Sequence, residues 1–128
     1  MNKLKMNDTI KWIMYYIILD QIWLIGNKAS HLSQVKLIQN EELQLDLFAG
    51  ILFYIFSGIA YTHFIKPLSK TKKEAFMNGA VMGFLMYMTF DLTNKAIFKK
   101  YEWNYAVKDV AWGTFVIGLV SYLVFKGI

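Results

Sequence analysis

The feature that most constrains this chain is the run 47–65, which contains no Asp, Glu, Lys or Arg. A helix in a soluble bundle shows a charged face opposite its apolar stripe, and this run has no such face. A membrane span needs about 20 mostly apolar residues. Three further segments reach that length with their flanks: 12–26, 75–98 and 105–125. The pattern therefore favours membrane-spanning helices over a soluble four-helix bundle.

The composition agrees with a membrane protein. Of the 128 residues, 56% are hydrophobic and 18% are charged, against about 25% charged in soluble domains. All 14 basic residues are lysines, and lysines at segment ends are typical of anchors at a membrane surface. The lack of Arg, whose fork binds phosphates, argues against nucleic acid as a partner. With no Cys, disulfides, thiol chemistry and Cys-ligated zinc are excluded.

We therefore predict an all-α fold, an integral membrane four-helix bundle. It forms a single transmembrane domain over residues 1–128, with helices at about 9–27, 46–65, 75–98 and 105–126. The segment 27–46 is expected to be either a short surface helix or an irregular loop. Lysines precede the first apolar run as in a signal peptide, but Asp20 ends that run, so we expect a retained first helix. The dense lysines at 70–73 place both termini on the cytoplasmic side.

Three carboxylates interrupt the apolar segments: Asp20, Asp91 and Asp109. A charge at membrane depth is costly unless it faces the interior of the bundle and finds a partner. In the predicted topology all three lie within roughly 10 Å of the same membrane face, at ~1.5 Å rise per residue. Each also has a purely structural explanation. Asp20 can fix helix packing, Asp91 can pair with Lys95 one turn on, and Asp109 can cap the start of its helix.

Helical spacing predicts which side chains accompany the aspartates, because residues three or four apart share a helix face. The expected polar site consists of Asp20, Trp23, Tyr87, Asp91, Asn94, Asp109 and Trp112. The two tryptophans have an alternative role as interfacial belt residues. Close helix packing is expected at three small residues: Gly79, Gly83 and Gly113.

This aspartate layer predicts a polar pocket in the outer half of the bundle, open to the outer surface, which binds or passes a cation, a proton or a small polar solute. The alternatives are a structural or accessory membrane protein and a membrane-embedded lipid-modifying enzyme, so catalysis is left open. His31 in a loop and His63 at the far end of its helix form no cluster, so no metal site and no cofactor are expected. The expected partners are the lipid bilayer and, because four helices are few for a transporter, further copies of the chain.

These signatures together resemble the DUF2177 family of small membrane proteins of bacteria and viruses. The matching residues keep their order over nearly the whole chain: Asp20 with Trp23-Leu24, Tyr54, Gly83, Tyr87, Asp91-Leu92-Thr93-Asn94, Trp103, and Asp109 with Trp112-Gly113. Phe90 stands where the family commonly has a tyrosine, and Ser30-His31 stands where it tends to have an aromatic residue. The resemblance implies a four-helix integral membrane protein and implies no particular activity.

Overall fold

The computed structural model describes residues 2–126, with side chains from residue 8 onward. The described chain is helical apart from short connections, and it contains no strand. Its elements are α1 (Asn2–Gly26), α2 (Lys28–Gln39), α3 (Leu47–Ala60), the π-helical turn η1 (Tyr61–Ile65), the 3-10 turn η2 (Lys66–Leu68), α4 (Lys72–Ile97) and α5 (Trp103–Val124). The lysines at positions 3 and 5, which entered the prediction of topology, have side chains outside the described residues.

Within the described residues, three helical segments are long and apolar enough to cross a membrane: Leu47–Leu68, Lys72–Ile97 and Trp103–Val124. The prediction of several spans is therefore confirmed for the second, third and fourth apolar segments. α1 forms a helix of 25 residues, but its mean hydropathy is too low for it to count among these three segments. Its polar first turns and the Asp20–Gln21 pair lower its mean hydropathy, which is the physical reason for the difference.

The first long connection contains a fifth helix, α2, so the structure has one helix more than the four that were predicted. Of the two expectations for this segment, a short surface helix is the one observed. α2 ends at Asn40, which adopts a left-handed conformation with φ of 61°, a common way for a helix to stop. After an exposed loop, the side chain of Asp46 accepts a hydrogen bond from the Ala49 backbone N–H at 3.1 Å and caps α3.

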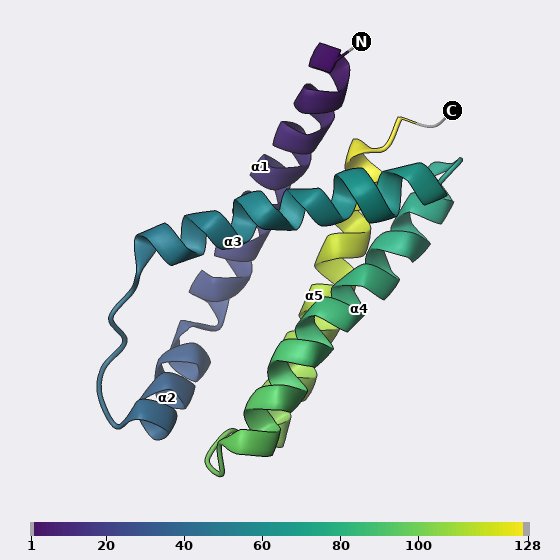
Figure 1. Cartoon of the computed structure of the whole chain (residues 1–128). Helices are drawn as coiled ribbons and strands as arrows, with labels where there is room; N and C mark the ends of the chain where they lie inside the picture. Colours follow the sequence, from purple (N-terminus) through teal and green to yellow (C-terminus); the bar gives the residue numbers. More distant parts are fainter. Residues whose placement is uncertain (1, 127–128) are drawn as a thin grey trace.

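α4 and α5 form an antiparallel hairpin and lie side by side along most of their length (Figure 1). Glycines allow this close approach. A Cβ added at Gly79 would lie 2.7 Å from the backbone oxygen of Ile117, and one added at Gly83 would collide with the backbone oxygen of Gly113. A Cβ at Gly113 would in turn meet the ring of Tyr87. Because these glycines have no side chain of their own, the two helices pack at short distance.

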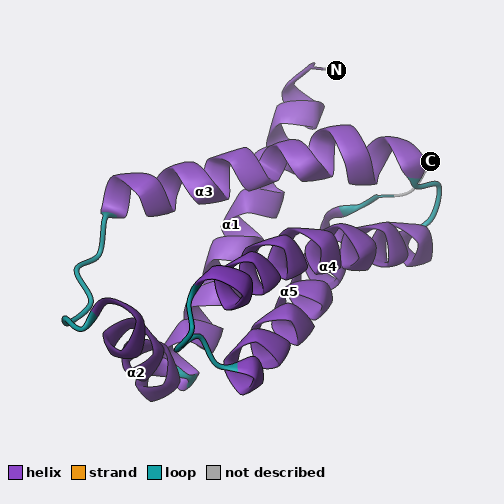
Figure 2. Ribbon diagram, turned by 60° about the horizontal axis from the view of Figure 1, so that its bottom comes forward, coloured by secondary structure: helices purple, strands orange, loops and turns teal. Residues whose placement is uncertain are grey.

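α1 packs against α5, and α3 crosses α1 at a steep angle (Figures 1 and 2). The contact between α1 and α5 includes a hydrogen bond from Trp12 Nε1 to the Ser121 hydroxyl at 3.1 Å. The buried core lies at this crossing and consists of Trp12, Tyr16, Tyr61, Ile65, Val116, Ile117, Val120 and Val124. The core therefore occupies the half of the molecule that contains the termini.

Both described ends of the chain lie at the same end of the molecule as the connection between α3 and α4 (Figure 1). Asp8 of α1 links the two ends of the chain and this connection, because its carboxylate lies 2.7 Å from Lys66 Nζ and 3.7 Å from Lys126 Nζ. The helix that precedes this connection continues past Lys66–Pro67 as the short turn η2 and stops at Leu68.

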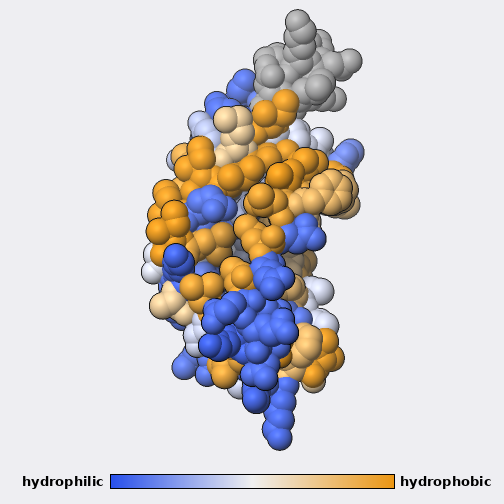
Figure 3. All heavy atoms as spheres, turned by 90° about the vertical axis from the view of Figure 1, so that its left-hand side faces the viewer, coloured by the Kyte–Doolittle hydropathy of each residue, from blue (hydrophilic) through white to orange (hydrophobic). Residues whose placement is uncertain are grey.

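The surface is unusually apolar for a folded chain, with many large hydrophobic side chains more than half exposed on α3, α4 and α5. Figure 3 shows a broad hydrophobic band above a hydrophilic cluster, which lies at the end where Figure 1 places α2 and the loop after it. Exposed apolar area on this scale is unfavourable in water. The band is therefore the surface that contacts lipid in a membrane protein.

Candidate functional site

Asp20 connects three helices. The Tyr54 hydroxyl from α3 donates a hydrogen bond to Asp20 Oδ2 at 2.5 Å, and Trp112 Nε1 from α5 donates one to Asp20 Oδ1 at 2.9 Å. Asp20 is 8% exposed and lies on the same face of α1 as Trp12 and Tyr16, at spacings of four residues. Both carboxylate oxygens are thus paired, as a buried charge requires.

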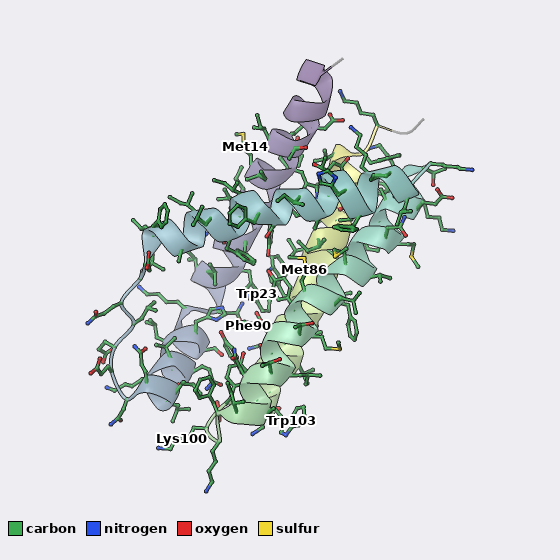
Figure 4. The ribbon with its side chains drawn as sticks, in the orientation of Figure 1. Met14, Trp23, Met86, Phe90, Lys100 and Trp103 are labelled. Atoms are coloured by element: carbon green, nitrogen blue, oxygen red, sulfur yellow. The ribbon has the colours of Figure 1, made fainter. Side chains whose placement is uncertain are left out.

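Trp23 and Trp112 stack face to face beside this carboxylate, with ring centroids 4.8 Å apart and planes inclined by 4°. The two rings therefore contact each other, whereas the alternative role had them as separate belt residues at the membrane surface. The indole N–H of Trp23 is buried and has no hydrogen-bond partner among the described residues. Trp103, by contrast, is 60% exposed and points away from the other labelled aromatic residues (Figure 4).

Asp91 of α4 is fully buried and accepts a hydrogen bond from the hydroxyl of Tyr101 in the connection between α4 and α5. Burial, followed by the contact with Asp91, raises the pKa of the Tyr101 phenol, so the hydroxyl stays protonated and donates. Asn94 also interacts with the Tyr101 side chain. Lys95, the alternative partner for Asp91, instead places its ammonium group 5.9 Å from the Trp103 ring centroid.

Asp109 does not cap its helix, because α5 begins at Trp103 and Asp109 is therefore beyond the first turn. Its carboxyl group is close enough to that of Asp91 for the two groups to interact electrostatically. Two carboxylates this close repel each other unless a proton lies between them. The second oxygen of Asp91, Oδ2, has no donor among the described residues. A proton or a cation between the two carboxyl groups would relieve this repulsion.

A cavity of about 330 Å³ lies beside this carboxylate pair. Four residues of the expected polar site line it: Asp20, Trp23, Tyr87 and Asp109. Trp23 from α1 and Met86 and Phe90 from α4 lie in the space between these helices (Figure 4). The other three residues of the expected site are not lining residues. Trp112 donates a hydrogen bond to Asp20, Asp91 interacts with Asp109, and Asn94 interacts with Tyr101. The Tyr87 hydroxyl also forms a hydrogen bond with the Tyr16 hydroxyl of α1.

The predicted site lacks six lining residues: two polar ones, His31 and Tyr105, and four apolar ones, Leu24, Phe53, Met86 and Phe90. His31 Nδ1 lies 2.7 Å from the Tyr105 hydroxyl, and His31 Nε2 is buried with no partner among the described residues. Burial lowers the pKa of His31, so the imidazole is neutral at pH 7. Because His31 belongs to the separate helix α2, no spacing from Asp20 could reveal its place.

α2 is held against the end of the hairpin by one buried side chain, Gln34, which is 3% exposed. Its Nε2 donates to the Lys100 backbone oxygen at 3.2 Å, and its Oε1 accepts from the Glu102 backbone N–H at 3.1 Å. These two hydrogen bonds satisfy two backbone groups of the turn between α4 and α5. It also fixes the position of His31 in the cavity wall, three residues earlier on the same helix.

The apolar helices define a multi-pass integral membrane protein, and two of its aspartates, Asp20 and Asp91, are buried. The chain belongs to the DUF2177 family, described as a predicted membrane protein, whose model matches residues 8–126. No curated protein and no solved structure gives a significant match to the chain. The resemblance drawn from the sequence signatures is therefore confirmed, and the family description assigns no activity.

Proposed function

We propose that the cavity beside Asp20 and Asp109 is a membrane-embedded binding site for a small organic cation, which exchanges with a proton. The observation that carries this proposal is the charge of the cavity wall. Two carboxylates line the cavity, a third lies behind Asp109, and the lining residues include no lysine. Lys108 lines a smaller neighbouring hollow together with Asp109. A cation in this cavity would compensate charges that are otherwise costly to bury.

The aromatic walls support an organic ammonium ion as the ligand. Trp23, Phe53 and Tyr105 are among the lining residues, and aromatic faces attract ammonium groups. A volume of about 330 Å³ is at the lower end of the range of about 300–1,000 Å³ for ligand pockets. The lining residues also include His31, Tyr87 and Tyr105, and such polar side chains favour a ligand that carries a hydrogen-bonding group as well as its charge.

The carboxylate pair supports exchange with a proton. Asp91 and Asp109 interact with each other, and we propose that they share one proton, as carboxyl pairs in other proteins do. A cation bound beside Asp109 supplies the positive charge that this proton supplied, so the proton leaves the pair as the cation enters. Membrane carriers commonly use buried carboxylates in this manner.

The topology that accompanies this proposal has α1 as a fourth span and both termini in the cytoplasm. α1 has 25 residues, which at ~1.5 Å rise per residue exceed the ~30 Å hydrocarbon core. The ends of the chain gather with the lysine-rich start of α4 at one end of the molecule (Figure 1), which suits the positive-inside rule. Further copies of the chain, packed in the bilayer, would be needed to enclose a complete pathway.

A purely structural role is the second candidate, and the bonds of Asp20 favour it. Asp20 already has a donor on each oxygen, from α3 and from α5, and this arrangement alone can hold three helices in register. Asp109 distinguishes the two functions, because its carboxyl group lines the cavity and interacts most strongly with another carboxyl group, that of Asp91.

The test is a titration of the detergent-solubilised protein with ethanolammonium, propylammonium and potassium chloride, followed by tryptophan fluorescence. We expect saturable binding of ethanolammonium, weaker binding of its isostere propylammonium, and release of about one proton per bound cation to a pH dye. Asp109→Asn should abolish binding and proton release. Asp46→Asn, which removes a carboxylate from the exposed cap of α3, should bind as the wild type does.

Two results would contradict the proposal. One is the absence of a saturable response to any of the three cations in the folded wild type. The other is an Asp109→Asn variant that binds with wild-type affinity, which would leave the structural role as the better account. Flux of the bound cation into liposomes under a pH gradient then separates a carrier from a binding protein.

A further inference from the structure

Two surface hollows away from the aspartate cavity meet at Trp103. The first is an apolar groove of about 690 Å³ between α4 and α5, and the second is a polar hollow of about 590 Å³ at the turn that joins them. Trp103 lines both. An elongated ligand can therefore occupy both hollows at once, with an apolar part in one and a polar part in the other.

The apolar groove has the dimensions of a lipid chain. It runs along α4 from Phe76 to Leu92, which at ~1.5 Å rise per residue is about 24 Å. One leaflet of the hydrocarbon core is about 15 Å thick, so the groove exceeds the depth that one acyl chain needs. Its α5 wall includes Val107, Ala111 and Phe115, and the small side chain of Ala111 leaves the groove open at that point.

The polar hollow carries positive charge at the headgroup level. Lys95, Lys99 and Lys100 line it, together with a single acidic residue, Glu102. The Lys95 ammonium group lies 5.9 Å from the centre of the exposed Trp103 ring, and tryptophan prefers the boundary between hydrocarbon and headgroups. The lysines therefore surround the position that the phosphate of a lipid seated in the groove would occupy.

We propose that these two hollows form a binding site for one anionic glycerophospholipid. An acyl chain fills the groove between α4 and α5, and the phosphate pairs with the three lysines. The charge pattern favours a lipid over a second copy of this chain. A copy in the same membrane orientation would bring its own lysines to the same depth, where like charges repel. This site shares no lining residue with the aspartate cavity, so a test of one site does not depend on the other.

The test measures lipid binding to the delipidated protein by native mass spectrometry. The probes are phosphatidylglycerol, phosphatidylcholine with the same chains, and glycerol 3-phosphate, which lacks chains. We expect phosphatidylglycerol to bind more tightly than phosphatidylcholine, and glycerol 3-phosphate to bind very weakly. The triple variant Lys95→Gln/Lys99→Gln/Lys100→Gln should lose about 100-fold in affinity for phosphatidylglycerol and little for phosphatidylcholine.

Matched variants separate this site from general effects of charge and folding. Lys28→Gln/Lys70→Gln/Lys73→Gln removes the same charge from exposed positions outside the site and should keep the preference for phosphatidylglycerol. Lys99→Gln/Lys100→Gln, at two exposed positions of the turn, tests the headgroup without altering a helix. Ala111→Phe, which fills the groove, should weaken both lipids, whereas Ala49→Phe at an exposed position of α3 should weaken neither.

Three outcomes would overturn the proposal. Equal affinity of the wild type for phosphatidylglycerol and phosphatidylcholine would show that the lysines do not form a site for an anionic headgroup. Tight binding of glycerol 3-phosphate would indicate a site for free phosphate esters rather than for a lipid. Conversion of an oligomer to a monomer by Ala111→Phe, with lipid binding unchanged, would show that a second copy occupies the groove.

Discussion

The indole N–H of Trp112 donates a hydrogen bond to Asp20 Oδ1 across 92 residues of sequence, at a distance of 2.9 Å. This bond joins the first helix to the last, and Tyr54 completes the set of donors from α3. The carboxylate is therefore a junction of three helices as well as part of the cavity wall.

The junction predicts a large effect of Trp112→Phe on stability. The variant keeps an aromatic ring against Trp23 but leaves Asp20 Oδ1 without its donor. A lost hydrogen bond to a buried charged group costs about 1.5–3 kcal/mol. Unfolding of the detergent-solubilised protein by SDS, followed by circular dichroism, measures the loss. Trp103→Phe is the control at an exposed position, and equal stability of the two variants would contradict the assignment.

Glycine packing predicts opposite effects at two positions. In Gly113→Ala the new methyl group would collide with the Tyr87 ring, so we expect a loss of at least 1–3 kcal/mol, roughly the cost of overpacking. In Gly50→Ala the methyl group has no neighbour within 4 Å, so the helix propensity of Ala should add about 0.5–1 kcal/mol. The same unfolding measurement compares them. A tolerated Gly113→Ala would show that the hairpin can move apart at this point.

The buried imidazole predicts a dependence of stability on pH. Because burial lowers the pKa of His31 from its usual 6.5, the folded protein binds this proton less readily than the unfolded chain does. The contribution of neutral His31 to the free energy of unfolding is therefore full above pH 6.5 and decreases as the pH falls below 6.5. Thermal unfolding between pH 5 and 7.5 should show a weaker dependence in His31→Asn than in the wild type.

The control for that experiment is the second histidine, His63, which is exposed in η1. His63→Asn should keep the dependence of the wild type. If His31→Asn and the wild type lose stability in parallel as the pH falls, then the carboxylates and not His31 carry the effect.

The docking of α2 depends on Gln34. Gln34→Leu keeps a similar volume but leaves the Lys100 carbonyl and the Glu102 N–H without partners, at a cost of about 1–3 kcal/mol per buried group. We expect faster hydrogen exchange throughout α2 with little change in α4 and α5. Ser33→Ala, at an exposed position of the same helix, is the control. Unchanged exchange in Gln34→Leu would show that other contacts hold α2.

Local patterns were sufficient for much of the fold. The uncharged run that begins at Leu47 and the long apolar segments around Gly83 and Gly113 predicted helices, because backbone groups in lipid must bond within the segment. α1 also formed a helix, but Asp20 and Gln21 lower its hydropathy. Because candidate spans are recognised by their hydropathy, α1 is not among the three candidate spans. Residues 28–39 left two readings open, because a short amphipathic stretch is compatible with a loop as well as with a helix.

The sequence by itself determined the class of protein and the helix faces on which the aspartates lie, because hydropathy and the 3.6-residue period are properties of neighbouring residues. Only the tertiary structure decided the partners. It brought Asp91 to Asp109 rather than to Lys95, joined Trp112 to Asp20, and placed His31 from α2 in the cavity wall. These contacts depend on how helices that are far apart in the chain cross, and on the absence of side chains at Gly83 and Gly113, which allows α4 and α5 to approach so closely.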